Sequence, residues 1–182
     1  VGGFALLYGN ARIALRGLER NAETIKVLAA GGIEMRVQFL VAAAQRLALP
    51  ATALLAFLLA SGLASRWRTL IQFWYRTPFG DVDPIFQRDI AYYVFTLPAV
   101  QVALDWLWGL TFVALLFVAL PIYLVRGDIG VRLGRLRIDP QAEWHLAILG
   151  ALWLLVAAVR TWVIGLPGLL FGTHGPLQGA SW

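Results

Sequence analysis

The chain has 182 residues, of which 60% are hydrophobic and only 14% are charged, and its mean hydropathy is +0.73. Soluble domains usually carry about a quarter charged residues, so this composition excludes an ordinary soluble domain and indicates a membrane protein. The net charge of +5 could suit nucleic acid, but the basic residues lie between apolar runs rather than on one face, so no nucleic-acid partner is expected. The absence of cysteine excludes disulfides, thiolate metal sites and a cysteine nucleophile.

Apolar runs of membrane-crossing length recur along the chain, since a helix needs about 20 residues to cross a hydrocarbon core of roughly 30 Å. The predicted fold class is therefore all-α, a fragment of a polytopic transmembrane helical bundle with interfacial helices. Because Val1 opens inside an apolar segment, residues 1–8 are expected to end a span whose beginning is missing. Complete spans are expected at 47–64, 99–125 and 144–166.

The connections between these spans share the basic residues unevenly. The segments 9–46 and 126–143 together hold ten, whereas 65–98 holds four and 167–182 holds none. The positive-inside rule therefore predicts that 9–46 and 126–143 are cytoplasmic loops, and that 65–98 and 167–182 are an outer loop and an outer tail. One or two surface helices broken near Gly31 and Gly32 are expected in the first loop, and turns at Gly127, Gly130, Gly134 and Asp139-Pro140 in the second.

An amphipathic segment, RWRTLIQFWYR, occupies 66–76 and follows the first complete span without a helix breaker. Its Trp67, Leu70, Ile71 and Trp74 recur at i, i+3, i+4 and i+7, and its arginines lie elsewhere around the helix. This pattern predicts a helix that lies in the membrane interface, where tryptophan is enriched.

The stretch 77–98 carries the acidic residues of the outer loop. Asp81, Asp83 and Asp89 could suggest a calcium site, but their spacing lacks the glycine and the final glutamate of an EF-hand loop. Asp83 followed by Pro84 favours instead a helix N-cap and first helical position.

The apolar end of that stretch, IAYYVFTL, leaves two structures open. Its residues suit a short interfacial helix, and their β-branched and aromatic content also suits an extended segment. In either case Leu97-Pro98 is expected to start the next span.

Two ionisable side chains, Asp105 and Arg160, lie inside apolar runs. At about 1.5 Å of rise per residue, both fall at a similar depth toward the outer side of the membrane. One hypothesis is an ion pair between the second and third complete spans that faces the bundle interior, because a lone charge would be costly there. The alternative is that Arg160 extends outward to the interface and Asp105 caps an interfacial turn.

Catalytic and metal-binding arrangements are missing from the sequence pattern. His145 and His174 fall on opposite sides of the predicted topology and cannot share a metal. Ser61, Ser65 and Ser181 have no neighbouring base. No catalytic residue, metal site or cofactor is therefore expected in this chain.

The stretch TPFGDVDPIFQRDIAYYVFTLP, with RWRTLIQFWY before it, resembles the signature segment of the UPF0182 family, large bacterial integral membrane proteins of unknown function. The segment LLFGTHGPLQGAS at 169–181 resembles another part of that family. The resemblance implies a multi-span N-terminal membrane domain, of which this chain is an interior part, followed by a large extracytoplasmic region. The signature residues that it implies for the outer loop are Thr77, Pro78, Phe79, Gly80, Asp83, Pro84, Phe86, Asp89, Tyr93, Phe95, Leu97 and Pro98.

Three functions are compatible with these observations. The first is a scaffold or anchor of a larger envelope protein, multi-pass in the bacterial cell membrane, with the lipid bilayer and the remaining spans and extracytoplasmic region of the same polypeptide as its partners. The second is a component of a transport or export system that uses Asp105 and Arg160. The third is the membrane domain of an envelope-acting enzyme, whose catalytic groups would lie outside this chain.

Overall fold

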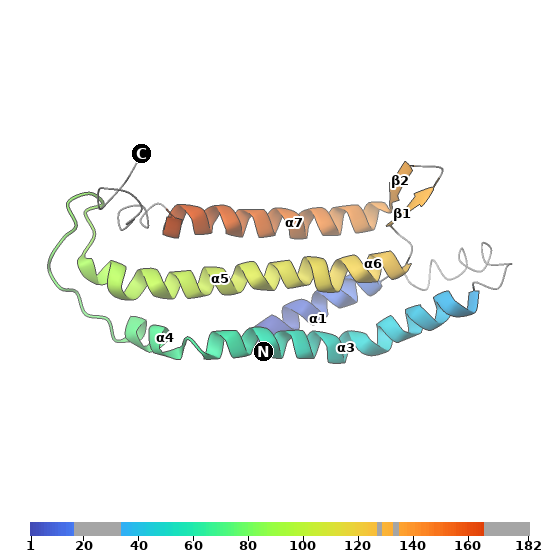
Figure 1. The fold of residues 1–182 in the computed structure, drawn as a ribbon, viewed down its shortest axis with the longest axis horizontal. Coiled ribbons are helices and arrows are strands. Elements are labelled where there is room, and N and C mark those ends of the chain that lie inside the picture. The colour runs from blue at the N-terminus through green and yellow to red at the C-terminus, as the bar shows by residue number, and fades with distance from the viewer. Residues whose placement is uncertain (17–33, 127–128, 133–134, 166–182) are drawn as a thin grey trace, which may run out of the picture. The chain divides into compact units, whose positions relative to one another are not determined.

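A computed structural model describes residues 1–16, 34–126, 129–132 and 135–165, and the described chain is largely helical (Figure 1). Its helices are α1 (Gly2–Leu15), α3 (Glu34–Ala64), α4 (Trp67–Trp74), α5 (Leu97–Val113), α6 (Leu120–Arg126) and α7 (Pro140–Arg160), with π-helical turns η1 (Tyr92–Thr96), η2 (Ala114–Ala119) and η3 (Thr161–Gly165). The predicted all-α class is confirmed, and a short hairpin of β1 (Ile129–Arg132) and β2 (Arg135–Ile138) is added to it.

Three of these helical stretches are long and apolar enough to cross a membrane: Gln45–Ala64, Tyr92–Leu124 and Pro140–Gly165. By its internal contacts the chain divides into two compact units. The first consists of Val1–Ala60 and Leu110–Leu152, and the second of Ser61–Gly109 and the chain from Trp153 onward.

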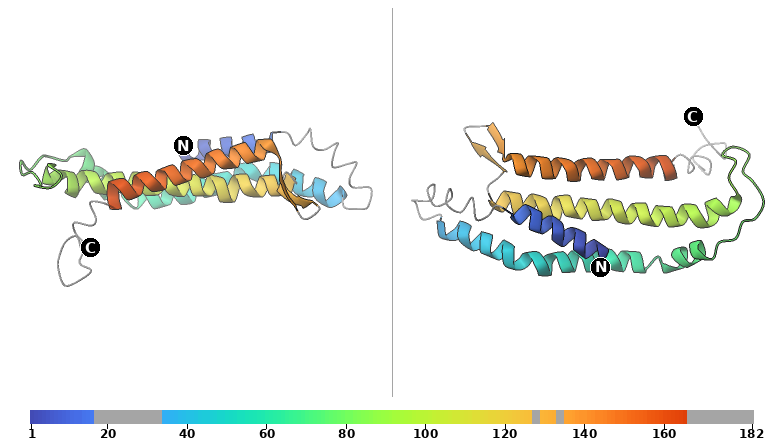
Figure 2. Two further views of the ribbon diagram at one scale, coloured as in Figure 1. Left: turned by 90° about the horizontal axis from the view of Figure 1, so that it is seen from above. Right: turned by 180° about the vertical axis from the view of Figure 1, so that it is seen from behind.

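The core of the first unit is one large side chain set among small ones. Tyr123 of α6 is completely buried, and Ala14, Ala119 and Ala142 around it are completely buried as well. Both views in Figure 2 place α1 beside this part of the chain, and α1 contacts η2 and α6. The alanines allow the helices to approach closely enough to enclose the tyrosine ring.

Helix α1 continues beyond the predicted boundary at Tyr8 and ends at Leu15. The physical reason is the amide of Asn10, which is buried and donates from Nδ2 to the carbonyl oxygen of Ala114 at 2.8 Å. A polar residue is thereby accommodated inside a helix interface. Helix α3 begins at Glu34, inside the segment where surface helices were expected, and the candidate span within it starts at Gln45, close to the predicted residue 47. Residues 17–33 with their glycines lie outside the described residues.

The second candidate span begins earlier than the predicted residue 99, because the helix is continuous from Ile90 through Pro98. Proline lacks an N–H and its ring displaces the carbonyl four residues before it, which usually kinks a helix. Here a π-helical turn precedes each proline: Leu97 N–H donates to Tyr92 O before Pro98, and η2 ends just before Leu120-Pro121. The wider turn accommodates the proline without ending the helix. The extended alternative for this segment is therefore wrong.

Helix α4 is separated from α3 by a turn at Ser65 and Arg66, although the sequence contains no obvious breaker there. The hydroxyl of Ser65 donates to the carbonyl oxygen of Gly62 at 2.7 Å, and Arg66 N–H bonds to Leu63 O in a tightened turn. Serine side chains that bond to nearby carbonyls compete with the helical ladder. The amphipathic helix predicted at 66–76 is present as α4, and this turn separates it from α3.

Helix α7 begins at Pro140 rather than at the predicted residue 144, so Asp139-Pro140 starts a helix instead of ending a loop. Asp139 accepts the Gln141 N–H on its carboxylate and the Glu143 N–H on its carbonyl oxygen, and proline suits the first helical position. The hairpin before it pairs Ile129 with Ile138 and Arg132 with Arg135. The predicted outer tail at 167–182, with His174, lies outside the described residues.

Candidate functional site

The carboxylate of Asp89 accepts backbone N–H groups from both sides of the loop between α4 and the helix that begins at Ile90. Its Oδ1 accepts the N–H groups of Phe79 at 3.2 Å and Ala91 at 2.7 Å, and its Oδ2 accepts the Gly80 N–H at 3.0 Å. Asp89 is thus the N-cap of the helix that begins at Ile90. Gly80 has a φ of 84°, a left-handed conformation that glycine adopts without strain.

Asp83 organises the tip of the loop. It accepts the N–H groups of Ile85 at 3.3 Å and Phe86 at 2.8 Å, and the hydroxyl of Tyr93 donates to its Oδ2 at 2.9 Å. The predicted capping role of Asp83-Pro84 is present, but the cap serves a single turn rather than a helix. Tyr93 attaches that turn to η1, so the tip is held against the start of the membrane-length helix.

Hydrogen bonding lowers the pKa of both carboxyl groups from the ordinary value of 3.8. The largest cause is the Phe86 N–H for Asp83 and the Ala91 N–H for Asp89. Both groups are therefore ionised at neutral pH, and their oxygens are directed at backbone donors. Within the described ranges, no group of three histidine or acidic side chains could hold a metal.

The remaining residues that the resemblance implies as signature positions lie in the same loop and the helix after it. Phe79 and Phe95 form an edge-to-face pair with ring centroids 5.7 Å apart, and Phe86 is exposed. The guanidinium of Arg88 lies over the ring of Tyr92, 4.5 Å from the ring centroid. The other positions follow the backbone: Thr77 and Pro78 lead into the loop, Pro84 lies in the tip turn, and Leu97 and Pro98 lie in the helix.

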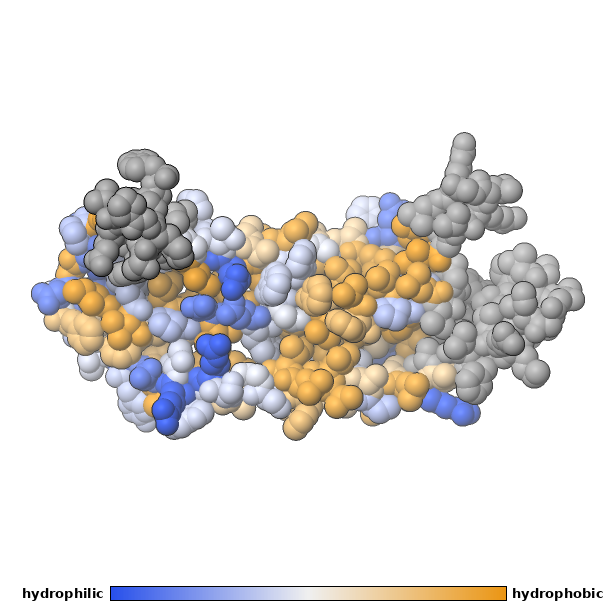
Figure 3. Space-filling view, viewed as in Figure 1, coloured by the Kyte–Doolittle hydropathy of each residue, from blue (hydrophilic) through white to orange (hydrophobic). Residues whose placement is uncertain are grey.

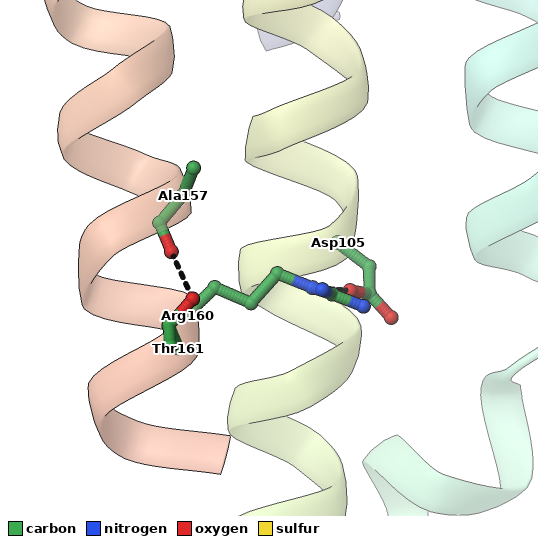
Figure 4. Close-up of polar contacts among 4 residues, drawn as sticks. All are labelled: Asp105, Ala157, Arg160 and Thr161. Carbon is green, nitrogen blue, oxygen red and sulfur yellow. Dashed lines mark hydrogen bonds and ion pairs between the residues drawn. The ribbon is translucent and has the colours of Figure 1, made fainter. Parts of the chain in front are cut away.

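Asp105 and Arg160 lie in contact in the second unit. Arg160 is the last residue of α7, and its side chain extends to α5, where Nε donates to Asp105 Oδ1 at 2.6 Å (Figure 4). Within this chain the side chain of Asp105 is 40% exposed and that of Arg160 is 45% exposed. Trp108 and Trp153 stack with ring centroids 5.5 Å apart on the same two helices. An ion pair and an aromatic pair therefore connect α5 to α7.

The polar contact of Tyr123 with His145 was not anticipated from the sequence. The tyrosine hydroxyl lies 2.8 Å from His145 Nδ1, and the two rings meet edge to face in the core of the first unit. The two residues come from different helices, α6 and α7, and nothing in their sequence spacing signals the contact. The contact gives His145 a structural role.

Comparison with known proteins decides the family. The model of one protein family, described as "Uncharacterised protein family (UPF0182)", matches residues 1–182 of this chain. The chain belongs to the UPF0182 family. The family suggested by the sequence resemblance is thereby confirmed.

Curated UPF0182 proteins from diverse bacteria resemble the chain. A UPF0182 protein of Bradyrhizobium diazoefficiens is 36% identical over 140 residues, which cover 75% of this chain and 15% of the relative. One of Salinibacter ruber is 32% identical over 138 residues, and one of Synechococcus is 34% identical over 122 residues. The chain thus spans about 15% of the length of the curated relatives it matches. No solved structure matches it.

Proposed function

We propose that this UPF0182 chain is a membrane-spanning helical domain of the bacterial cell membrane that anchors and orients the rest of a larger envelope protein. The observation that carries the proposal is the exposed apolar surface of the candidate spans. The share of each span buried inside the chain is 6%, 33% and 0%, and the helical surface drawn in Figure 3 is largely hydrophobic. Lipid or further helices must cover this surface, because exposing so much apolar area to water is unfavourable in free energy.

The polar groups of the candidate spans support a membrane environment. A helix satisfies its backbone groups internally, as a hydrocarbon core requires. The hydroxyl of Thr52 donates to the carbonyl oxygen of Ala48 at 2.6 Å, and the hydroxyl of Thr161 donates to the carbonyl oxygen of Ala157 at 3.0 Å. Each acceptor lies on the same helical stretch as its donor. Neither hydroxyl needs water as a partner.

The outer loop supports an anchoring role rather than catalysis. Its two ordered carboxylates, Asp83 and Asp89, accept backbone N–H groups and fix the turn between α4 and the following helix. Carboxylates that accept backbone N–H groups in this way hold the connection between the two helices in one geometry. A defined junction is what a scaffold needs in order to orient the segments attached to it.

A component of a transport or export system is the second candidate, and the contact between Asp105 and Arg160 favours it. A charged pair that is almost half exposed within apolar helices would face the remaining spans of the polypeptide in a complete bundle. Intramembrane charges commonly mark ion or substrate pathways.

Cysteine accessibility tests the anchoring proposal, because this chain contains no native cysteine. Gln87→Cys lies in the exposed outer loop, and Leu154→Cys lies on α7, where the leucine is 61% exposed within the chain. In spheroplasts, a membrane-impermeant maleimide is expected to label Gln87→Cys and to leave Leu154→Cys unlabelled until detergent is added. Equal labelling of both positions in intact membranes would contradict the proposal, since the chain itself does not cover Leu154.

A further inference from the structure

A pocket lined by both polar and apolar side chains lies where α4 ends and the helix that begins at Ile90 starts. Its volume is about 450 Å³, and Trp74, Arg76, Asp89, Tyr92 and Thr96 are among its lining residues. This volume is within the range of roughly 300–1,000 Å³ that is typical of small-ligand sites. The pocket lies entirely within the second unit.

Arg76 contributes a positive charge to the lining of this pocket. Its Nη1 donates to the carbonyl oxygen of Phe73 at 3.0 Å, and its guanidinium lies over the Phe73 ring at 4.3 Å. In the described part of the chain, no carboxylate forms an ion pair with it. The guanidinium is therefore held in position with further N–H donors unused, and its planar shape suits the two oxygens of a phosphodiester.

Asp89 places a negative charge in the same pocket. Its carboxylate accepts three backbone N–H groups, and a carboxylate offers about four acceptor positions. Hydrogen bonding lowers its pKa, so the group stays ionised at neutral pH. The formal charges of Arg76 and Asp89 balance, which fits a zwitterion better than a net anion.

The apolar stripe of α4 adjoins the pocket. Trp67, Leu70, Ile71 and Trp74 are all exposed, and Trp74 belongs to both the stripe and the pocket wall. Tryptophan and tyrosine are enriched at the level of lipid headgroups. A ligand with a polar head in the pocket could place an apolar chain along the stripe.

We propose that this pocket binds the headgroup of an aminophospholipid of the outer leaflet, with the phosphodiester on Arg76 and the ammonium group on Asp89. The acyl chains lie along the stripe of α4. The inference rests on the proposed membrane location. It predicts a preference for a primary ammonium, whose N–H groups can donate to Asp89, over the quaternary ammonium of a choline lipid.

Native mass spectrometry of the detergent-purified full-length protein tests the proposal. Phosphatidylethanolamine, phosphatidylglycerol and phosphatidylcholine are added in equal amounts, and the retained lipids are counted. Wild-type protein is expected to retain phosphatidylethanolamine preferentially. Arg76→Gln is expected to lower that retention about tenfold, the effect of losing one charge-assisted hydrogen bond. The matched control is Arg68→Gln, since Arg68 lies over Trp67 at 5.6 Å and is not needed by the pocket.

Three results would overturn the lipid assignment. The first is a wild-type preference for phosphatidylglycerol or no preference at all. The second is an equal loss of retention in Arg68→Gln and Arg76→Gln. The third is displacement of the lipid by inorganic phosphate or glycerophosphoethanolamine at the same concentration, which would assign the pocket to a soluble phosphate compound.

Extraction with alkaline carbonate separates this proposal from the one on which it rests. Wild-type protein and Arg76→Gln are both expected to stay in the membrane pellet. If carbonate released the wild-type protein, the anchoring function would be wrong. If the protein stayed in the pellet without selecting phosphatidylethanolamine, the pocket assignment alone would be wrong.

Discussion

Replacing Asp105 with asparagine, or Arg160 with glutamine, is expected to lower the free energy of unfolding by about 2 kcal/mol, whereas the double replacement loses much less. The single variants leave one charge without its partner at 2.6 Å. Removing one member of a fully buried pair costs roughly 3–5 kcal/mol, and the partial exposure of this pair lowers that figure.

Unfolding by denaturing detergent in micelles measures the effect, and a double-mutant cycle gives the coupling energy. Thr161→Val is a control at the adjacent position, since it replaces with a methyl group only the hydroxyl that bonds to its own helix. A coupling energy near zero, with both single variants as stable as the wild type, would mean that the contact does not stabilise the protein. Arg160 extending outward to the interface would then be the better interpretation.

Replacing Tyr123 with alanine is expected to destabilise the first unit by about 3–5 kcal/mol, the usual cost of removing a large aromatic side chain from a core. Tyr123 is completely buried among alanines at 14, 119 and 142. The three alanines have no rotamers with which to fill the cavity, so any relaxation would have to come from the partly buried isoleucine and leucine side chains packed against this cluster.

Tyr123→Phe is the matched control for this prediction. It keeps the ring and removes only the hydroxyl that contacts His145 Nδ1, so a loss of about 1 kcal/mol is expected. Thermal unfolding of the purified protein compares the two variants. Equal destabilisation of Tyr123→Phe and Tyr123→Ala would mean that the hydroxyl contact stabilises the core more than packing of the ring does. That result would contradict the prediction.

The long helices could be predicted from the sequence because apolar length alone signals them. Their ends could not, because local polar contacts decide where a helix begins. Asn10 looks like a loop residue until the carbonyl oxygen of Ala114, far away in the sequence, supplies its acceptor. Asp139-Pro140 suits a turn or a helix start equally well by type, and only the Gln141 and Glu143 N–H groups distinguish them.

Proline was the other source of error in the helix boundaries. Pro98 suggested that a helix begins at that position, since proline is favoured in a first turn. The π-helical turn at Tyr92–Thr96 instead carries the helix through it. Such a turn depends on a shift in the hydrogen-bond register that residue type does not specify.

The candidate site was predictable only in part, for a similar reason. Two charges at a similar depth in apolar runs suggested the contact between Asp105 and Arg160, because each needs a partner there. The pocket was not anticipated, because Arg76 and Asp89 come together only once the outer loop folds back through its caps. The sequence could show that Asp83 is a cap, but not that it caps a single turn or that Tyr93 would donate to it.

The central claim is that the chain crosses the bacterial cell membrane with the loop at 65–98 outside, and reporter fusions test it most directly. A reporter that is active only in the cytoplasm is fused after Gly80, in the outer loop, or after Gly130, in the hairpin beyond the helix that ends at Arg126. Activity is expected from the Gly130 fusion alone. Activity from the Gly80 fusion alone would reverse the orientation, and equal activity from both would contradict a membrane crossing between them.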